Sequence, residues 1–113
     1  TVISLCPVQN SLKLIGGKWK ISILYNLREA PVRFGALKRL HSPITPQMLS
    51  KQLREMEADN LIYRKVFEVI PPKVEYSLTD FSKSLIPIFE SLCEWSTEHE
   101  EFIEAIIEDK FIN

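Results

Sequence analysis

Apolar residues recur every three or four positions along much of the chain, which is the spacing of one face of a helix. After Pro7, the residues Val8, Leu12 and Ile15 follow this spacing, and Gly16-Gly17 interrupts it. Proline is favoured in the first turn of a helix, and glycine is favoured just beyond its end. The pattern therefore predicts a first helix between Pro7 and the two glycines.

Two more helices are predicted before residue 42. The second covers residues 18–29 and is stopped by Pro31, because the residue before a proline disfavours helical geometry. Its inward-facing residues are expected to be Trp19, Ile23, Leu24 and Leu27. The third helix covers residues 34–41, where an apolar residue recurs every third position. Between them, Val32-Arg33 is too short to predict a strand.

The fourth helix, from residue 46 to about 58, has the clearest boundaries. Thr45 can cap the free backbone N–H groups at its start, and Pro46 is tolerated at the first helical position. Asn60 follows the helix and accepts the left-handed conformation that such ends require.

After residue 60 the pattern changes from helical to alternating. Residues 61–69 are rich in β-branched and aromatic side chains, and residues 73–78 alternate between apolar and polar. Ile70-Pro71-Pro72 lies between the two segments. This arrangement predicts a two-stranded hairpin with a stiff tip.

The last segment is predicted to be one long helix from Thr79-Asp80 to about Asp109. Pro87 falls inside it and should either kink the helix or mark its true first turn. The apolar stripe of this helix is wide, and its first row consists of Phe81, Leu85, Ile88, Leu92, Trp95, His99, Phe102 and Ile106.

Three helices followed by a hairpin is the plan of a winged helix-turn-helix protein, with the third and fourth predicted helices as the helix-turn-helix pair and the hairpin as the wing. The expected fold class is therefore mainly α with a small β-wing (α+β), and the 113 residues suit a single domain over 1–113. Within it, residues 6–78 are expected to form a DNA-binding core with the wing at about 61–78. Residues 79–110 are expected to form a dimerisation helix.

Charge is distributed unevenly along the chain. Residues 1–78 carry 12 Lys+Arg against 6 Asp+Glu, whereas residues 79–113 carry 2 against 9, so a net charge of −1 hides balances of +6 and −7. A basic module joined to an acidic segment is typical of a nucleic-acid binder with a second, separate task. The alternative is that a solvated acidic helix distorts the count.

Several function classes are not supported by the sequence. The two histidines lie far apart, and no glycine-rich phosphate loop or zinc-hydrolase motif is present, so no enzyme, metal or cofactor is expected. No run of about 18 apolar residues suggests a membrane span. Cys6 and Cys93 form no CxxC pair, which favours a reduced, cytoplasmic protein.

The fourth helix divides into an inner and an outer face. Leu49, Leu53 and Met56 form the face expected to bury. The outer face is predicted to be a recognition surface that presents hydrogen-bond donors to the major groove. Its residues, none of which is acidic, are Thr45, Gln47, Ser50, Lys51 and Arg54. The alternative is an ordinary amphipathic surface helix.

Basic residues elsewhere are expected to contact the DNA backbone or the minor groove, which gives affinity and register but little sequence information. These are Arg33, Lys38, Arg64, Lys65 and Lys73. Each of them could instead be a solvated surface charge.

The wide apolar stripe is more than one small domain needs, which predicts a homodimer. The residues expected at its interface are Val8, Leu12, Leu92, Trp95, Phe102, Ile103 and Ile106. Two-fold pairing would place two recognition helices roughly 34–36 Å apart, so a near-palindromic operator is expected. The alternative is a monomer whose last helix folds over its own domain.

Several motifs together resemble those of the HxlR-type helix-turn-helix regulators, relatives of the MarR group. They span residues 6 to about 96 and comprise Cys6-Pro7-Val8, Ile15-Gly16-Gly17-Lys18-Trp19, Arg33-Phe34, the segments 48–55, 59–64 and 71–79, and Trp95. The resemblance implies dimeric, cytoplasmic DNA-binding regulators of bacteria and archaea that pair through their first and last helices. The chain departs from the family pattern at Gln47, Pro43, Asn60, Ser82 and Ala36.

The resemblance also implies a response to oxidants or electrophiles through the cysteine before the first helix, a position that Cys6 occupies. A thiol just before a helix N-terminus is favoured as the reactive thiolate. The alternative is that Cys6 is a small packing residue at the dimer interface. Cys93 lies on the apolar stripe and is expected to pack.

Two other functions remain open on the sequence alone. A winged helix can serve protein–protein contact, although the basic outer face of the fourth helix favours DNA. A small-molecule sensor would need an apolar pocket, which Trp19, Phe89 and Trp95 could line, but core packing explains these residues equally well.

Overall fold

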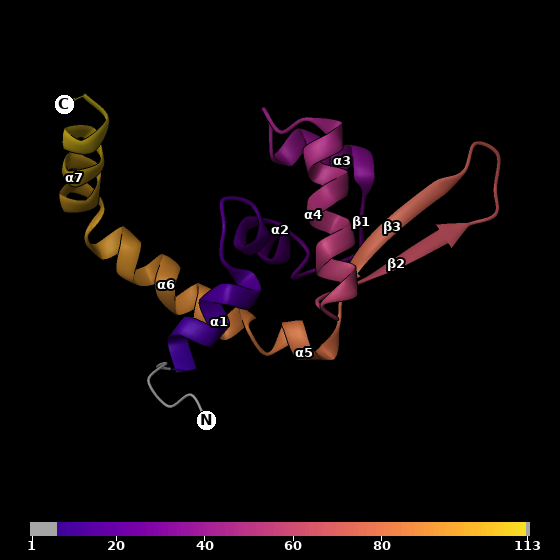
Figure 1. Ribbon diagram of the computed structural model, residues 1–113, viewed down its shortest axis with the longest axis horizontal. Coiled ribbons are helices and arrows are strands. Elements are labelled where there is room, and N and C mark those ends of the chain that lie inside the picture. The colour runs from indigo at the N-terminus through magenta and orange to yellow at the C-terminus, as the bar shows by residue number, and fades with distance from the viewer. Residues whose placement is uncertain (1–6, 113) are drawn as a thin grey trace.

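The computed structural model describes residues 7–112, with side chains through residue 110, and forms a mainly helical domain with a small antiparallel sheet (Figure 1). The elements in chain order are α1 (Pro7–Ile15), α2 (Lys20–Asn26), β1 (Val32–Arg33), α3 (Phe34–Leu40), α4 (Pro46–Ala58), β2 (Ile62–Phe67), β3 (Lys73–Leu78), α5 (Asp80–Lys83), α6 (Ile86–Glu98) and α7 (Glu100–Ile112). The predicted α+β class and the predicted element order up to the hairpin are confirmed.

The first two helices are separated by the paired glycines. A Cβ on Gly16 would lie 2.2 Å from the Leu12 carbonyl oxygen, and Gly17 has a φ of +106°, so both positions require glycine. The second helix is shorter than the predicted 18–29, because Trp19 precedes it and Leu27 already lies beyond its end. Trp19 and Leu27 nevertheless contribute to the core.

Helix α4 begins and ends as its sequence predicts. The Thr45 hydroxyl accepts a hydrogen bond from the Met48 backbone N–H at 3.1 Å, and Pro46 occupies the first turn. After the helix, Asn60 adopts a φ of 60°, and the Leu61 N–H returns to the Met56 carbonyl at 2.9 Å. The two ends fix which residues of α4 face inward and which face outward.

The sheet has three strands in the order β1-β3-β2, all antiparallel. The predicted hairpin is confirmed, with a register that runs from Ile62 opposite Leu78 to Phe67 opposite Lys73. Strand β1 was too short to predict. Its two residues become a strand because Val32 pairs with Tyr76, more than forty positions along the chain.

The prediction of one long C-terminal helix is wrong, because the segment is divided into α5, α6 and α7. Pro87 lies in the first turn of α6. In a continuous helix its ring would clash with the carbonyl of Lys83, four residues earlier, and α5 ends at Lys83. A second break falls at His99, whose Nδ1 lies 2.9 Å from the Trp95 carbonyl oxygen. A side chain that bonds to the helix's own carbonyl ladder is one recognised cause of such a kink.

Two buried hydroxyls join the end of α4 to the beginning of α5. The Thr79 hydroxyl donates to the Asn60 carbonyl at 2.8 Å and accepts from the Ser82 N–H at 3.1 Å. The Ser82 hydroxyl donates to the Leu61 carbonyl. Both side chains are fully buried, so their hydrogen bonds are shielded from water.

The core lies where the helices meet the base of the sheet. Its buried side chains come from α1, α2, α3, α4, β2, β3, α6 and the loops between them, and they are Ile15, Ile23, Leu24, Leu27, Leu37, Ile44, Leu49, Leu53, Met56, Leu61, Ile62, Tyr76, Leu78 and Phe89. Outside this core, the β2–β3 hairpin projects at one end of the long axis, and α6 and α7 extend toward the other end (Figure 1).

We expect Leu53→Ala to lower the free energy of unfolding by about 2–5 kcal/mol, because Leu53 is only 2% exposed and its removal leaves a cavity beside α4. The same truncation at Leu40, which is 58% exposed, should cost less than about 1 kcal/mol. Chemical denaturation followed by circular dichroism measures both values. Equal losses in the two variants would contradict the placement of the core.

Candidate nucleic-acid interface

Helix α4 presents a sharply divided surface. Leu49, Leu53 and Met56 are buried in the core, whereas Gln47, Lys51 and Arg54 are exposed on the opposite side. Ser50 is half-buried between the two faces, and Thr45 caps the helix at its exposed start. The structure therefore brings together the five residues predicted for groove contact on one helix, with a rigid attachment behind them.

Polar contacts on its inner side hold α4 and the preceding turn in place. Lys20 of α2 pairs with Glu55 at 3.2 Å, and its side chain is only 14% exposed. Ahead of α4, the buried His41 donates from Nδ1 to the Leu37 carbonyl at 2.8 Å, so its Nε2 accepts from the Asn26 amide at 3.2 Å. Lys20 therefore positions the helix and is not a free cation on its outer face.

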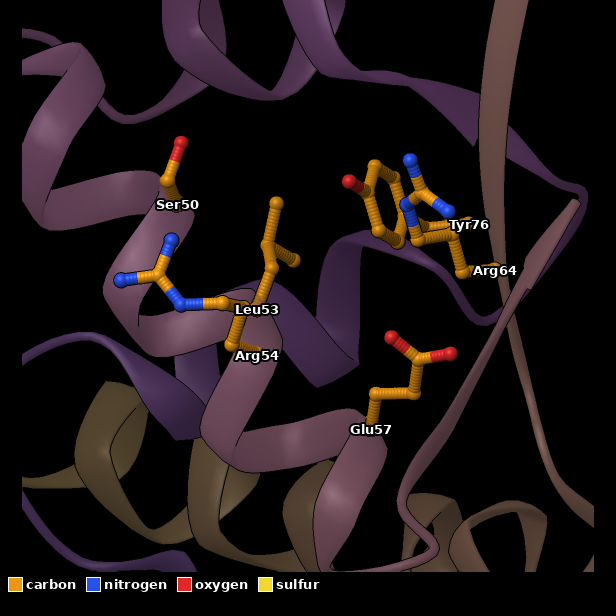
Figure 2. A pocket seen from close by; sticks show the side chains of 6 residues that line it. All are labelled: Ser50, Leu53, Arg54, Glu57, Arg64 and Tyr76. Carbon is orange, nitrogen blue, oxygen red and sulfur yellow. The ribbon is translucent and has the colours of Figure 1, made fainter. Parts of the chain in front are cut away.

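An open cleft of about 370 Å³ lies between α4 and the sheet (Figure 2). Ser50, Leu53, Arg54 and Glu57 line it from α4, and Arg64 and Tyr76 line it from β2 and β3. Helix α4 and the hairpin thus share one continuous surface, with one arginine from α4 and one from the hairpin lining the cleft.

Glu57 is a residue of this surface that the sequence interpretation missed. It follows Arg54 by three positions, so helical spacing alone puts it on the same outer face. Its carboxylate lies at the C-terminal end of α4, where it repels phosphate groups. The N-terminal half of α4, with Gln47 and Lys51, is the half that a phosphate backbone can approach most closely.

The wing cations are separated by the alternation of the sheet. Arg64 pairs with Tyr76 and lies on the face of the sheet that looks toward α4. Lys65 is opposite Glu75 and therefore lies on the other face, together with Arg33, which also pairs with Glu75. Adjacent residues that looked equivalent in sequence thus belong to two different surfaces.

Lys73 joins Lys65 on that second face. Its ammonium group lies 3.4 Å from the Glu75 carboxylate, and both lysine Nζ atoms sit over the Phe67 ring, at 4.5 Å for Lys73 and 4.8 Å for Lys65. Cation–π contacts of this kind hold flexible side chains in place. The outer part of the wing therefore carries two ordered positive charges.

Arg33 and Lys38 bracket α3. Arg33 is the residue just before α3, and Lys38 lies exposed in its last turn, where a positive charge interacts favourably with the helix dipole. Neither residue lines the cleft between α4 and the wing. They remain candidates for contacts with the DNA backbone at the edge of the interface.

The residues predicted for a dimer interface lie on α1, α6 and α7, away from α4 and the wing (Figure 1). All except Ile103, which is half-buried, are between 42% and 69% exposed, namely Val8, Leu12, Leu92, Trp95, Phe102 and Ile106. Cys93 on α6 is also exposed in the single chain, so the core does not cover it and its expected packing stays a prediction for the dimer surface. Cys6 lies outside the described residues.

The three rings considered for an apolar pocket have different surroundings. Phe89 is buried in the core. Trp19 packs against the core, and its ring stands edge-on to that of His41, with 6.5 Å between the ring centroids. Trp95 is half exposed and lies against His99 at 5.1 Å. Core packing accounts for Phe89 and Trp19.

A helix pair whose second member exposes a polar face, followed by an antiparallel hairpin, defines a winged helix-turn-helix protein. This chain belongs to the HxlR-like helix-turn-helix family, which matches residues 14–104. It is 53% identical over 95 residues to an HTH-type transcriptional regulator of Halalkalibacterium halodurans, covering 83% of this chain and 84% of that protein. It is 43% identical over 101 residues to the HTH-type transcriptional regulator YdeP of Bacillus subtilis, covering 89% of this chain and 79% of that protein.

Solved structures of similar proteins agree with the fold. The redox regulator HypR in its reduced form matches with a TM-score of 0.83 and 42% identity, covering 88% of this chain and 99% of that one. HypR in its oxidized form matches with a TM-score of 0.77 and 45% identity, covering 82% of this chain and 96% of that one. The protein is a transcription regulator of the helix-turn-helix type, as these relatives are named.

Within residues 7–112, no helix is long and apolar enough to cross a membrane. The same part of the chain contains no group of three or more His, Cys, Asp or Glu side chains arranged to hold a metal ion.

Proposed function

We propose that this protein is a homodimeric, sequence-specific regulator that places α4 in the major groove of double-stranded DNA. The observation that carries the proposal is the division of α4, in which Leu49, Leu53 and Met56 are buried while Gln47, Lys51 and Arg54 stand exposed. A helix fixed by one face and polar on the other is suited to present donors to base edges. Such a regulator would act on chromosomal DNA in the cytoplasm.

The division of charge along α4 indicates how it meets DNA. The acidic Glu57 disfavours close contact at the C-terminal end, so Gln47, Ser50 and Lys51 enter the groove first and Arg54 reaches a guanine edge or a phosphate. Arg64 lies across the cleft on the same side and contacts the adjacent backbone. Lys65 and Lys73 approach the phosphates from the opposite face of the wing.

Arg54→Ala is expected to weaken operator binding roughly 10- to 100-fold, equal to about 1–3 kcal/mol, because a guanidinium contact to a base or phosphate is lost. The measurement is fluorescence anisotropy with duplexes from the region upstream of the gene, over a salt series, since phosphate contacts make the affinity fall steeply with salt. The control is Lys83→Ala, which removes an exposed cation on α5 that does not line the cleft between α4 and the wing.

The control variant should bind as the wild type does. Binding that Arg54→Ala leaves unchanged would remove α4 as the reading element. The absence of any salt-sensitive DNA binding would instead favour the protein-interaction function that the fold also permits.

The proposed dimer uses the apolar surface of α1, α6 and α7. Contiguous exposed apolar residues on this scale mark interfaces in soluble proteins. The surface lies on elements that take no part in the cleft between α4 and the wing, so pairing through it leaves both free for DNA. A two-fold axis through this surface would set two α4 helices against one near-palindromic operator.

Leu92→Glu is expected to shift the protein from dimer to monomer, because Leu92 is half exposed in one chain and a carboxylate there would be buried without a partner in the dimer. Sedimentation velocity at micromolar concentration measures the change, against a chain mass of 13.1 kDa. Leu40→Glu, on the exposed side of α3, is the matched control and should remain dimeric. A Leu92→Glu variant that stays dimeric would contradict this interface.

A response to oxidants is a second proposal, supported by the similarity to HypR, which is described as a redox regulator in both forms. Cys6 directly precedes Pro7, where α1 begins, and a helix N-terminus stabilises thiolate. The thiolate would attack a peroxide oxygen, forming sulfenic acid and releasing hydroxide. Chemistry at this position would act next to the proposed dimer helix α1.

Cys6→Ser is expected to retain operator binding but to lose any change in binding that hydrogen peroxide causes in the wild type. Anisotropy titrations before and after peroxide treatment measure this, and Cys93→Ser controls for the exposed cysteine on α6. A wild-type response that survives in Cys6→Ser would exclude Cys6 as the sensor.

A further inference from the structure

The tip of the wing, residues 69–72, is apolar and uncovered. Ile70 is 100% exposed and Val69 is 51% exposed, and Pro71 and Pro72 complete the turn. A fully exposed isoleucine gains nothing from the fold, since no part of the chain that the structure describes lies over it. Its contribution is to be sought in contact with a partner.

The position of the tip excludes the proposed dimer surface as that partner. The hairpin projects at one end of the molecule, whereas α6 and α7 extend toward the other end (Figure 1). A copy bound on α1, α6 and α7 therefore leaves Ile70 exposed. The tip also directly precedes Lys73. The ammonium groups of Lys73 and Lys65 both make cation–π contacts with the Phe67 ring.

The positive charge around the tip is complementary to the phosphates of a nucleic acid. Positive charge lies on both faces of the hairpin, from Arg64 on the side of α4 and from Lys65 and Lys73 on the other side, against Glu68 and Glu75. Cations that flank an apolar tip suit a groove whose walls are phosphates and whose floor is apolar base and sugar surface.

The length of the wing fits the spacing of DNA grooves. Each strand has six residues, which at about 3.3 Å per residue gives roughly 20 Å. Half of a DNA turn of roughly 34 Å is about 17 Å, which is the distance from a major groove to the next minor groove along the axis. A wing of this length is therefore long enough to span the distance from a major groove that holds α4 to the neighbouring minor groove.

We propose that Ile70 is an apolar wedge that the wing inserts into this minor groove, partly unstacking one base step at the flank of each half-site. The proposal rests on the proposed function and extends it to positions that α4 does not contact. Two prolines restrict the turn, so the tip loses little conformational freedom on insertion. The preferred flank is a pyrimidine–purine step such as TA or CA, because these steps unstack at least cost.

The test uses a 30-base-pair duplex, selected from a random pool by the wild-type protein, with 2-aminopurine placed in turn at each flanking step. Fluorescence of 2-aminopurine rises when its neighbours unstack, so we expect a rise at one step of each flank on binding. Ile70→Ser should abolish the rise and weaken binding by about tenfold, the contribution expected from burying one such side chain. Ile70→Leu keeps an apolar wedge and should retain both signals.

Complete exposure of Ile70 means that neither variant should alter the fold, which a thermal melt checks. Wild-type binding with no fluorescence change at any flank would overturn the wedge while leaving the proposed function intact, and so would equal binding by Ile70→Ser. Weaker binding by Ile70→Ser without a wild-type fluorescence rise would show apolar contact without unstacking and would also overturn it. Failure of the wild type to enrich any duplex would overturn the proposed function itself, and the wedge with it.

Discussion

Leu49, Leu53 and Met56 attach α4 to the core by burial, and the exposed half of the helix depends on that attachment. A helix of 13 residues is only marginally stable alone, so its stability comes mainly from packing one apolar face. The same packing fixes the rotation of the helix about its axis. Gln47, Lys51 and Arg54 therefore project in fixed directions, which is a precondition for recognising a sequence of base edges.

Polar contacts around α4 add orientation to what burial provides. Thr45 determines where the helix begins, Asn60 determines where it ends, and the pair of Lys20 with Glu55 links its flank to α2. Exposed ion pairs contribute little free energy, but the Lys20 side chain is largely shielded, so its geometry is better defined. The exposed face of α4 is thus held by apolar packing and located by a few specific polar groups.

The parts of the fold that depend on local signals were predictable from sequence, and those that depend on distant contacts were not. Helix α4 was predicted correctly because its cap, its first-turn proline and its terminal asparagine are neighbours in the chain. Strand β1 exists only through pairing with β3, and no local pattern encodes that pairing. Similarly, the break at His99 lies within an uninterrupted apolar stripe, where no proline or glycine signals it.

For the candidate site, the sequence predicts candidate residues but not which of them share a surface. Arg64 and Lys65 are neighbours in the chain, although alternation along β2 places them on opposite faces. Glu57 is not among the predicted residues, although its spacing from Arg54 is sufficient to place it on the same face of α4.

The buried hydroxyls of Thr79 and Ser82 have a mechanical consequence. Their bonds to the carbonyls of Asn60 and Leu61 fasten the end of α4, the start of the wing and the first turn after the wing into one rigid corner. Helix α6 follows this corner after Ser84, where α5 has ended, and is anchored again by Phe89, which is buried in the core. The first turns of α6 therefore belong to the same body as α4 and the wing, and the part of the chain beyond Phe89 projects from that body.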